Sequence, residues 1–159
     1  MLRFRVNLNE GGDMIPMVRC RDYRIGDWSA IQELWNATGI GKAFRGDSEV
    51  VVQRTLAQGG RFLVLEEVTT GAIAGAVWLT QDGRRFNMHH FGIRPDRQGQ
   101  GLGRRLLVEA LDAVRSAGLP VKLEVHRDNA RALELYRHYG FTRVGNLEVL
   151  ILRDLENRK

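Results

Sequence analysis

The chain has 159 residues, 43% of them hydrophobic and 27% charged, which is the size and make-up of one globular domain. Cys20 is the only cysteine and no run of about 18 apolar residues occurs, which excludes a disulfide framework and favours a cytoplasmic protein without a membrane span. The net charge is +5, with 13 basic and 9 acidic side chains in residues 94–159, so the partner is expected to be anionic: nucleic acid, an acidic surface or a phosphorylated cofactor.

The first half of the chain predicts a β-meander interrupted by two short helices. Residues 1–13 are typical of a poorly packed leader, and a single domain is expected over residues 14–159. Asp27 is placed to cap the first helix, whose apolar face carries Leu34 and Trp35. Strands are predicted at 17–21, 62–65, 73–79 and 85–93, a second helix at 48–56, and a hairpin turn at Asp82-Gly83.

The second half alternates helices with strands. Apolar residues recur at steps of three and four from Leu102 to Val114, which predicts a helix that Gly118 and Pro120 end. The pattern then predicts a strand at 121–126, a helix at 129–139 and closing strands at 141–144 and 147–152. A meander followed by alternating elements indicates a mixed α/β sheet with helices on its faces.

The segment with the clearest chemical meaning joins the strand that ends at Ile93 to the helix that begins at Leu102. It contains three alternate glycines, and glycine lets a backbone approach an anion closely. The first turn of a helix adds unpaired N–H groups and the positive end of the helix dipole. Arginines flank the turn, so the sequence predicts a phosphate-binding turn. The residues concerned are Gly99, Gly101 and Gly103 with Arg97, Arg104 and Arg105.

Two familiar phosphate-binding motifs fail at this turn. A P-loop needs lysine and then serine or threonine after its last glycine, whereas Arg104 and Arg105 follow Gly103. A dinucleotide fingerprint needs a third glycine where this chain has Arg104 or Leu106, although Glu124 lies near the distance expected of a ribose-binding acid.

The turn instead resembles motif A of the GNAT acyltransferases, with the pattern Q-x-x-G-x-G from Gln98 to Gly103. A second pattern, N-x-x-A-x-x-x-Y-x-x-x-G-F from Asn129 to Phe141, resembles the asparagine-to-glycine-phenylalanine segment of the same family. The resemblance runs from Met17 to the C-terminus. It implies a central, splayed, mostly antiparallel sheet of about seven strands flanked by about four helices. The fourth and fifth strands of that fold part, and the pantetheine arm of acyl-CoA lies between them.

The resemblance also implies acetyl-CoA as the cofactor. The backbone of Phe91, Gly92 and Ile93 would meet pantetheine and the acyl carbonyl, and Asn129 would bond the pantetheine or diphosphate region. The residues assigned to the diphosphate are Arg97, Gln98, Gly99, Gln100, Gly101, Leu102, Gly103 and Arg104. From the residues alone, Asn129 is also read as a helix N-cap, and Gly92 as a bulge or a close backbone approach.

Tyr136 is the predicted catalytic acid. When an amine attacks a thioester, a thiolate departs, and a phenol at the sulfur can protonate it. The resemblance supplies this role. From the spacing alone, with Leu133 and Tyr139 three residues to either side, Tyr136 is also read as a core residue.

His89 is the predicted catalytic base, because an ammonium group must lose a proton before it attacks. It lies four residues before Ile93, where some family members carry a histidine. As neighbours in a strand, His89 and His90 are expected on opposite faces, so that at most one lines the site. Asn87 occupies a position where other members carry a catalytic glutamate. Two further acids remain open as proton relays, Glu66 and Glu124.

The predicted activity is acetyl transfer from acetyl-CoA to a primary amine, by direct attack in a ternary complex and with no metal. The segments expected to form the acceptor pocket, 28–58 and 145–150, carry no decisive motif. The alternatives are a GNAT-fold protein that binds acyl-CoA without catalysis, a dinucleotide enzyme and a basic nucleic-acid-binding module. The last would need aromatic residues interleaved with basic ones, and the tryptophans lie in apolar contexts instead. Neither nucleic acid nor a membrane is an expected partner, and family habit favours a homodimer.

Overall fold

The computed structural model describes residues 17–41, 46–146 and 150–151. They fall into two compact units, one ending at Glu124 and the other beginning at Val125. The predicted leader, residues 1–13, lies outside the described residues, and the prediction of a single domain stays a prediction.

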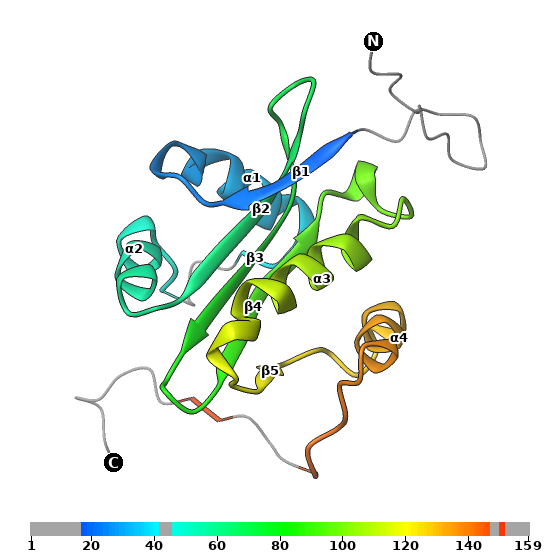
Figure 1. The fold of residues 1–159 in the computed structure, drawn as a ribbon. Coiled ribbons are helices and arrows are strands. Elements are labelled where there is room, and N and C mark those ends of the chain that lie inside the picture. The colour runs from blue at the N-terminus through cyan, green and yellow to red at the C-terminus, as the bar shows by residue number, and fades with distance from the viewer. Residues whose placement is uncertain (1–16, 42–45, 147–149, 152–159) are drawn as a thin grey trace. The chain divides into compact units, whose positions relative to one another are not determined.

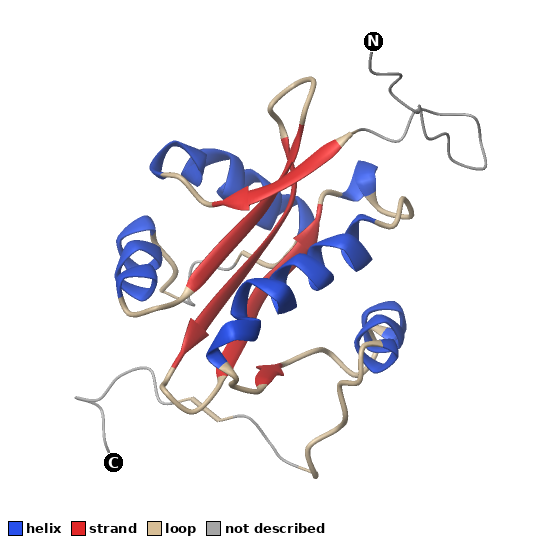
Figure 2. Ribbon diagram, in the orientation of Figure 1, coloured by secondary structure: helices blue, strands red, loops and turns tan. Residues whose placement is uncertain are grey.

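The first unit is built on a sheet that has five strands within the described residues, in the same order as in the chain (Figure 1). The strands β1 to β4 pair antiparallel, and the short β5 joins β4 in parallel (Figure 2). The strands are β1 (Val18–Asp22), β2 (Arg61–Glu67), β3 (Ile73–Gln81), β4 (Phe86–Ile93) and β5 (Val121–Leu123). The predicted mixed α/β fold with a mostly antiparallel sheet is confirmed.

Helices cover both faces of this sheet. On one face lie α1 (Trp28–Thr38), which a short 3-10 turn, η1 (Ile25–Asp27), precedes, and α2 (Glu49–Ala57). On the other lies α3 (Leu102–Val114), which runs into η4 (Arg115–Ala117) (Figure 1). Strand side chains alternate between the faces, so the near-continuous apolar runs in β2 and β3 fit a sheet that is buried on both sides.

Stacked rings fill the core beneath α1. The Trp35 ring lies 6.2 Å from that of Phe62 and 6.4 Å from that of Trp78, close to parallel with both. The α3 face is aliphatic, with the buried side chains Leu102, Leu106, Leu107, Ala110 and Val114 at the predicted helical spacing. The sequence periodicity of α3 therefore reports its burial correctly.

Asp27 occupies the predicted N-cap position of α1 but does not cap the helix with its side chain. Its carboxylate accepts hydrogen bonds from the Arg21 guanidinium at 2.7 and 2.8 Å and from the Arg24 amide at 2.7 Å. Burial raises the pKa of Asp27, but the bonds from Arg21 and Arg24 outweigh it and the pKa is lowered. The residue thus ties β1 to the start of α1.

A β-bulge interrupts the pairing of β3 with β4. Ala76 pairs with Gly92 and Trp78 with His89, so the single residue Val77 faces two residues of β4. His90, inside the bulge, has a φ of +49° and is the only described residue other than glycine with a positive φ. The bulge breaks the strict alternation of side chains at this point of β4.

The second unit contains α4 (Ala130–His138). The Asn129 side chain caps it by accepting a hydrogen bond from the Ala132 amide at 3.1 Å, so the N-cap interpretation is confirmed. The helix ends in a Schellman turn at Gly140, whose φ is +84°, and the Phe141 amide donates to the Tyr136 carbonyl at 3.0 Å.

The prediction of closing strands differs from the structure. The strand predicted at 141–144 is wrong, because Phe141 belongs to the helix end and Val144 is 73% exposed, with no strand beside it in the described part of the chain. Of the strand predicted at 147–152, residues 147–149 and 152 lie outside the described residues, and Leu150 and Ile151 form no strand. The sheet therefore has five described strands where about seven were expected. No helix in the described ranges has the length and apolar character needed to span a bilayer.

Leu106 of α3 is fully buried against the sheet, so shortening its side chain should destabilise the protein strongly. Leu106→Ala should lower the free energy of unfolding by about 2–5 kcal/mol, since it leaves a cavity. The matched control is Val108→Ala on the same helix, where the side chain is only half-buried and the loss should stay below about 1 kcal/mol. Urea titration of both variants measures this, and equal losses would contradict the packing described.

Candidate functional site

The glycine-rich turn begins after a short 3-10 turn, η3 (Pro95–Arg97), and runs into α3. Gly99 and Gly101 have φ values of +82° and +75°, and a Cβ atom at either would meet nothing within 4 Å. The left-handed backbone is therefore what requires glycine here, rather than crowding by the protein. Gly101 occupies the N-cap position of α3.

The backbone amides of this turn have no acceptor in the part of the chain that the structure describes. The helical hydrogen bonds of α3 begin only at Arg105, whose amide donates to the Gly101 carbonyl at 3.1 Å. Within the described residues, no hydrogen bond runs from the amides of Gly99 to Gly103 to another protein group. Unpaired amides and the positive end of a helix dipole are groups that favour a bound anion, and the phosphate-binding role of this turn stays a prediction.

The Gln98 side chain fixes the turn to the end of β4. Its Nε2 donates to the Ile93 carbonyl at 3.0 Å. The Arg94 amide bonds the Ala74 carbonyl of β3 at 2.8 Å, so the backbone groups of Ile93, one residue earlier, point away from β3. The Ile93 carbonyl thus faces the same side as the glycine-rich turn.

Strand β5 is much shorter than β4 and ends before it reaches this carbonyl. They pair only from Phe86 with Val121 to Met88 with Leu123, whereas β4 continues to Ile93. Beyond Met88 the β4 edge therefore runs without a β5 partner among the described residues. An edge of β4 that is open in this way, next to the glycine-rich turn, could take a long ligand with a phosphate group, and the parting of the fourth and fifth strands stays a prediction.

Gly92 lies where α1 approaches β4 closely. A Cβ atom at this position would come within 2.7 Å of Ile40 Cδ1 and 3.6 Å of Thr38 Oγ1. The sequence left two interpretations of Gly92 open, a bulge or a close backbone approach. The structure shows a close approach at Gly92 itself, and the bulge lies just before it, at His90. Phe91 is half-buried between them.

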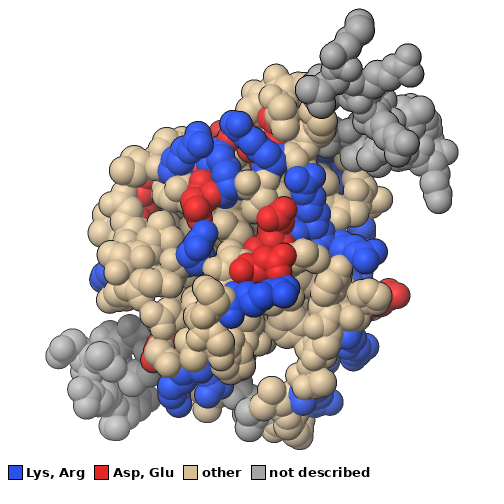
Figure 3. All heavy atoms as spheres, viewed as in Figure 1, with Lys and Arg blue, Asp and Glu red and all other residues tan. Residues whose placement is uncertain are grey.

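The predicted basic residues differ in their surroundings. Arg97 directs its Nε to the Glu67 carboxylate at 2.6 Å and an Nη to Asp96 at 3.1 Å. Arg104 and Arg105, in the first turn of α3, are exposed, and Arg105 lies 3.9 Å from Glu109. Figure 3 shows basic and acidic side chains interspersed over the face that carries α3. Local positive charge at the turn therefore comes from the start of α3 rather than from a broad basic patch.

Both histidines of β4 lie near Trp78. His89 pairs directly with Trp78, with the rings 6.1 Å apart, and the His90 ring is 5.7 Å from the same indole. The expectation that His89 and His90 lie on opposite faces is therefore wrong, because the bulge turns His90 toward the α1 face, where it contacts Trp35 at 4.2 Å.

The two imidazoles have different partners. His89 is exposed, and its Nε2 shares a hydrogen bond of 2.9 Å with Thr80 Oγ1. Although the residue as a whole is exposed, one side of its ring faces Trp78, and the loss of water there lowers the pKa of His89. The neighbouring His90 lowers this pKa further, so His89 is mostly neutral at pH 7. His90 is buried and its Nε2 lies 2.8 Å from Asp47 Oδ2, which links β4 to the segment before α2.

Tyr136 belongs to the second unit. Its ring is buried, with 7% exposed, and lies 5.6 Å from that of Phe141. Burial raises the pKa of Tyr136 to about 12, so the phenol is protonated at neutral pH. This is the state that a proton donor needs, and the catalytic role of Tyr136 stays a prediction. The second function suggested for Asn129, contact with a ligand, stays a prediction as well.

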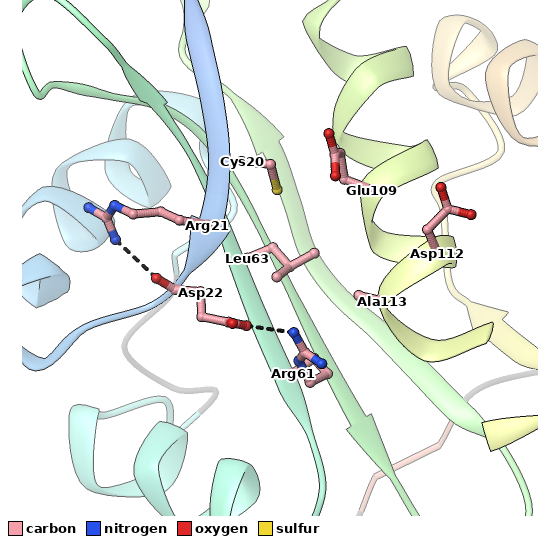
Figure 4. A pocket seen from close by; sticks show the side chains of 8 residues that line it. All are labelled: Cys20, Arg21, Asp22, Arg61, Leu63, Glu109, Asp112 and Ala113. Carbon is pink, nitrogen blue, oxygen red and sulfur yellow. Dashed lines mark hydrogen bonds and ion pairs between the residues drawn. The ribbon is translucent and has the colours of Figure 1, made fainter. Parts of the chain in front are cut away.

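A hollow lies apart from the turn, where β1 and β2 face α3. Cys20 and Leu63 line its strand side, and Glu109 and Ala113 its helix side (Figure 4). Burial, followed by the charge of Glu109, raises the pKa of the Cys20 thiol to about 11. The thiol stays protonated at neutral pH, which disfavours it as a nucleophile.

Two carboxylates at the site were not singled out from the sequence. Asp47 contacts His90, and Glu67 contacts Arg97. One signal was available for Glu67, since a glutamate at the end of an apolar strand is rarely buried without a cationic partner. No local pattern marks Asp47, because its partner lies 43 residues away in the chain.

Comparison with known proteins finds one family. The model described as the acetyltransferase (GNAT) family matches residues 28–141. The N-alpha-acetyltransferase RimI of Mycobacterium tuberculosis is 46% identical over 79 residues, which are 47% of this chain and 49% of that protein. This chain thus spans about half the length of that relative. The L-amino acid N-acyltransferase MnaT of Escherichia coli is 34% identical over 131 residues, 74% of this chain and 76% of that protein.

A solved structure supports the fold independently. The ribosomal-protein-S18-alanine N-acetyltransferase from Escherichia coli superposes with a TM-score of 0.68 and 23% sequence identity. The superposition covers 80% of this chain and 79% of that one.

Proposed function

The chain belongs to the acetyltransferase (GNAT) family, and we propose that it transfers an acetyl group from acetyl-CoA to an α-amine, either of an amino acid or of a peptide N-terminus. The names of two relatives support this acceptor class. One is called an N-alpha-acetyltransferase and the other an L-amino acid N-acyltransferase. An α-amine has a pKa near 8, about two units below that of a lysine side chain, so less driving force is needed to deprotonate it.

One observation carries the proposal: the amides from Gly99 to Gly103, which have no acceptor among the described residues, follow the end of β4 that extends beyond its pairing with β5. Acetyl-CoA supplies a thioester, whose acetyl group passes to the amine, on a carrier that also holds a diphosphate. The amides fit the diphosphate, and Arg104 adds charge at the same helix start. The β4 edge at Ile93 offers backbone groups for an amide-containing arm.

The remaining groups would move protons. In the reaction a C–N bond forms and the C–S bond breaks, while the amine loses one proton and the departing sulfur gains one. His89 is neutral at pH 7 and is assigned the role of base, and Tyr136 is protonated and assigned the role of acid. Direct attack in a ternary complex fits a Cys20 thiol that stays protonated.

Partners and location extend this proposal. The partners would be an acyl-CoA and an amine acceptor, and a homodimer and a cytoplasmic location stay predictions. The second candidate function is acyl-CoA binding without catalysis. It would be supported if the protein binds CoA but no amine tested causes release of CoA from acetyl-CoA.

Binding at the turn is tested with a pair of glycine variants. Gly101→Ala should raise the KM for acetyl-CoA about tenfold or more, because a positive φ is costly for alanine and the amides would shift. Gly83→Ala is the matched control, since Gly83 has a φ of +79° and equally open surroundings but lies in the β3–β4 hairpin. Steady-state kinetics and calorimetry with CoA measure both, and an unchanged KM in Gly101→Ala would end the assignment of the turn.

The role of His89 predicts a pH dependence. A base must be neutral, so kcat/KM should fall as the pH drops through the pKa of His89, which lies below its ordinary value of about 6.5. His89→Gln should remove this acidic limb and lower kcat about 100-fold. A profile that keeps the same limb in His89→Gln would assign the proton transfer to another group.

Tyr136→Phe tests the acid. Removing the hydroxyl should lower kcat about 10-fold to 100-fold and leave the KM for acetyl-CoA within about twofold, because proton donation acts in the transition state. Tyr139→Phe, one turn further along and half-buried, is the control and should keep kcat. Equal kcat values in the two variants would leave Tyr136 as a packing residue only.

A further inference from the structure

The last residue of β2, Glu67, is a buried carboxylate next to the glycine-rich turn. Only 3% of the residue is exposed. A charged group this deeply buried needs partners, because removal from water penalises the ionised form. Its neighbour Glu66 is also buried, at 6% exposed, so β2 ends in two buried acids.

Glu67 uses both carboxylate oxygens. Its Oε1 accepts from Arg97 Nε at 2.6 Å and from Arg94 Nη2 at 3.2 Å. Its Oε2 accepts from Thr70 Oγ1 at 2.9 Å, in the turn between β2 and β3. Asp96 joins the two arginines from the solvent side, at 2.6 Å from Arg94 and 3.1 Å from Arg97. The four charged groups form one closed network.

This network holds the segment that leads into the turn. The Arg97 amide donates to the Arg94 carbonyl at 2.9 Å, and the Gln98 amide to the Pro95 carbonyl at 3.3 Å, so η3 is a single folded turn. Gln98 follows directly and bonds Ile93. Glu67 is thus connected through Arg97 to Gln98, the residue directly before the first unpaired amide, that of Gly99.

The charges of the network cancel. Two arginines face two carboxylates, Glu67 and Asp96, so the network adds no net positive charge to the turn. Burial raises the pKa of Glu67, but the hydrogen bonds from Arg97 and Thr70 outweigh it and the pKa is lowered, so the carboxylate is ionised at neutral pH. Its contribution to anion binding is geometric rather than electrostatic.

We propose that Glu67 is a positioning residue for the acyl donor: through Arg94 and Arg97 it fixes η3 and so directs the amides from Gly99 to Gly103 toward the diphosphate. This inference rests on the proposed function of the turn. Arg97, whose sequence position suggests a ligand of the diphosphate, acts here as the link between the buried carboxylate and the turn.

The chain offers a matched control in Glu66. This residue is also buried and also binds two arginines, Arg19 and Arg21, but these lie on β1, and Arg21 leads to Asp27 at the start of α1. Glu66→Gln and Glu67→Gln therefore remove the same charge, from the same strand, with the same number of arginine partners. Only Glu67 is connected to the glycine-rich turn.

The experiment compares Glu67→Gln with Glu66→Gln in the full chain. Glu67→Gln should raise the Kd for CoA in calorimetry and the KM for acetyl-CoA about tenfold, with kcat at saturating donor nearly unchanged. Hydrogen exchange of a peptide spanning residues 94–105 should speed up in the absence of any ligand. Glu66→Gln should lower the melting temperature to a similar extent and leave the Kd for CoA, the KM for acetyl-CoA and the hydrogen exchange of residues 94–105 unchanged.

Each other outcome overturns the inference. Tighter, salt-dependent CoA binding in Glu67→Gln would mean that the carboxylate merely neutralises Arg97. Equal changes in both variants would mean a general loss of stability, and unchanged values would mean no link to the turn.

Should Glu67→Gln not fold, Arg94→Gln, which leaves the Arg97 contact in place, should give a smaller increase in the Kd for CoA. A wild-type protein that does not bind CoA would refute the proposed function, whereas the exchange measurement would still test the network.

Discussion

The proposed site depends on backbone amides that have no acceptor among the residues that the structure describes. They exist because the chain passes from β4 into α3 through residues with positive φ, and because the first amides of any helix lack a carbonyl one turn earlier. An anion is the natural partner of such a group. The side chains nearby add to this arrangement, but the polypeptide itself supplies the donors.

Holding these amides in place requires rigid neighbours. Gln98 ties the turn to the end of β4, Glu67 ties the preceding segment to the end of β2, and the aliphatic face of α3 anchors the helix to the sheet. All three contacts reach structural elements of the first unit. The glycines provide the required conformation, and these contacts select it from the many that glycine allows.

The bulge in β4 separates two tasks along one strand. Up to Met88 the strand pairs on both sides, and at the bulge the side chains of His89 and His90 face the aromatic core under α1. After it, the strand runs on to Ile93 along an edge that has no strand partner among the described residues, and Gln98 joins this end to the turn. In the proposed reaction, acetyl-CoA along this edge and an amine on the α1 face would then meet at β4. The positive φ of His90 is the local strain that this geometry carries.

The sequence by itself determined the class of fold, the order of the elements up to α4 and the location of the glycine-rich turn, because helical and strand periodicity and glycine patterns are local properties of the chain. It also placed the N-cap at Asn129. Only the tertiary structure decided that the two histidines share one side of β4, that Arg97 turns inward to Glu67, and that residues 141–144 end a helix instead of forming a strand. These outcomes depend on a bulge, on a buried charge and on the absence of a neighbouring strand within the described residues. Each is set by residues far apart in the chain, where local pattern carries no information.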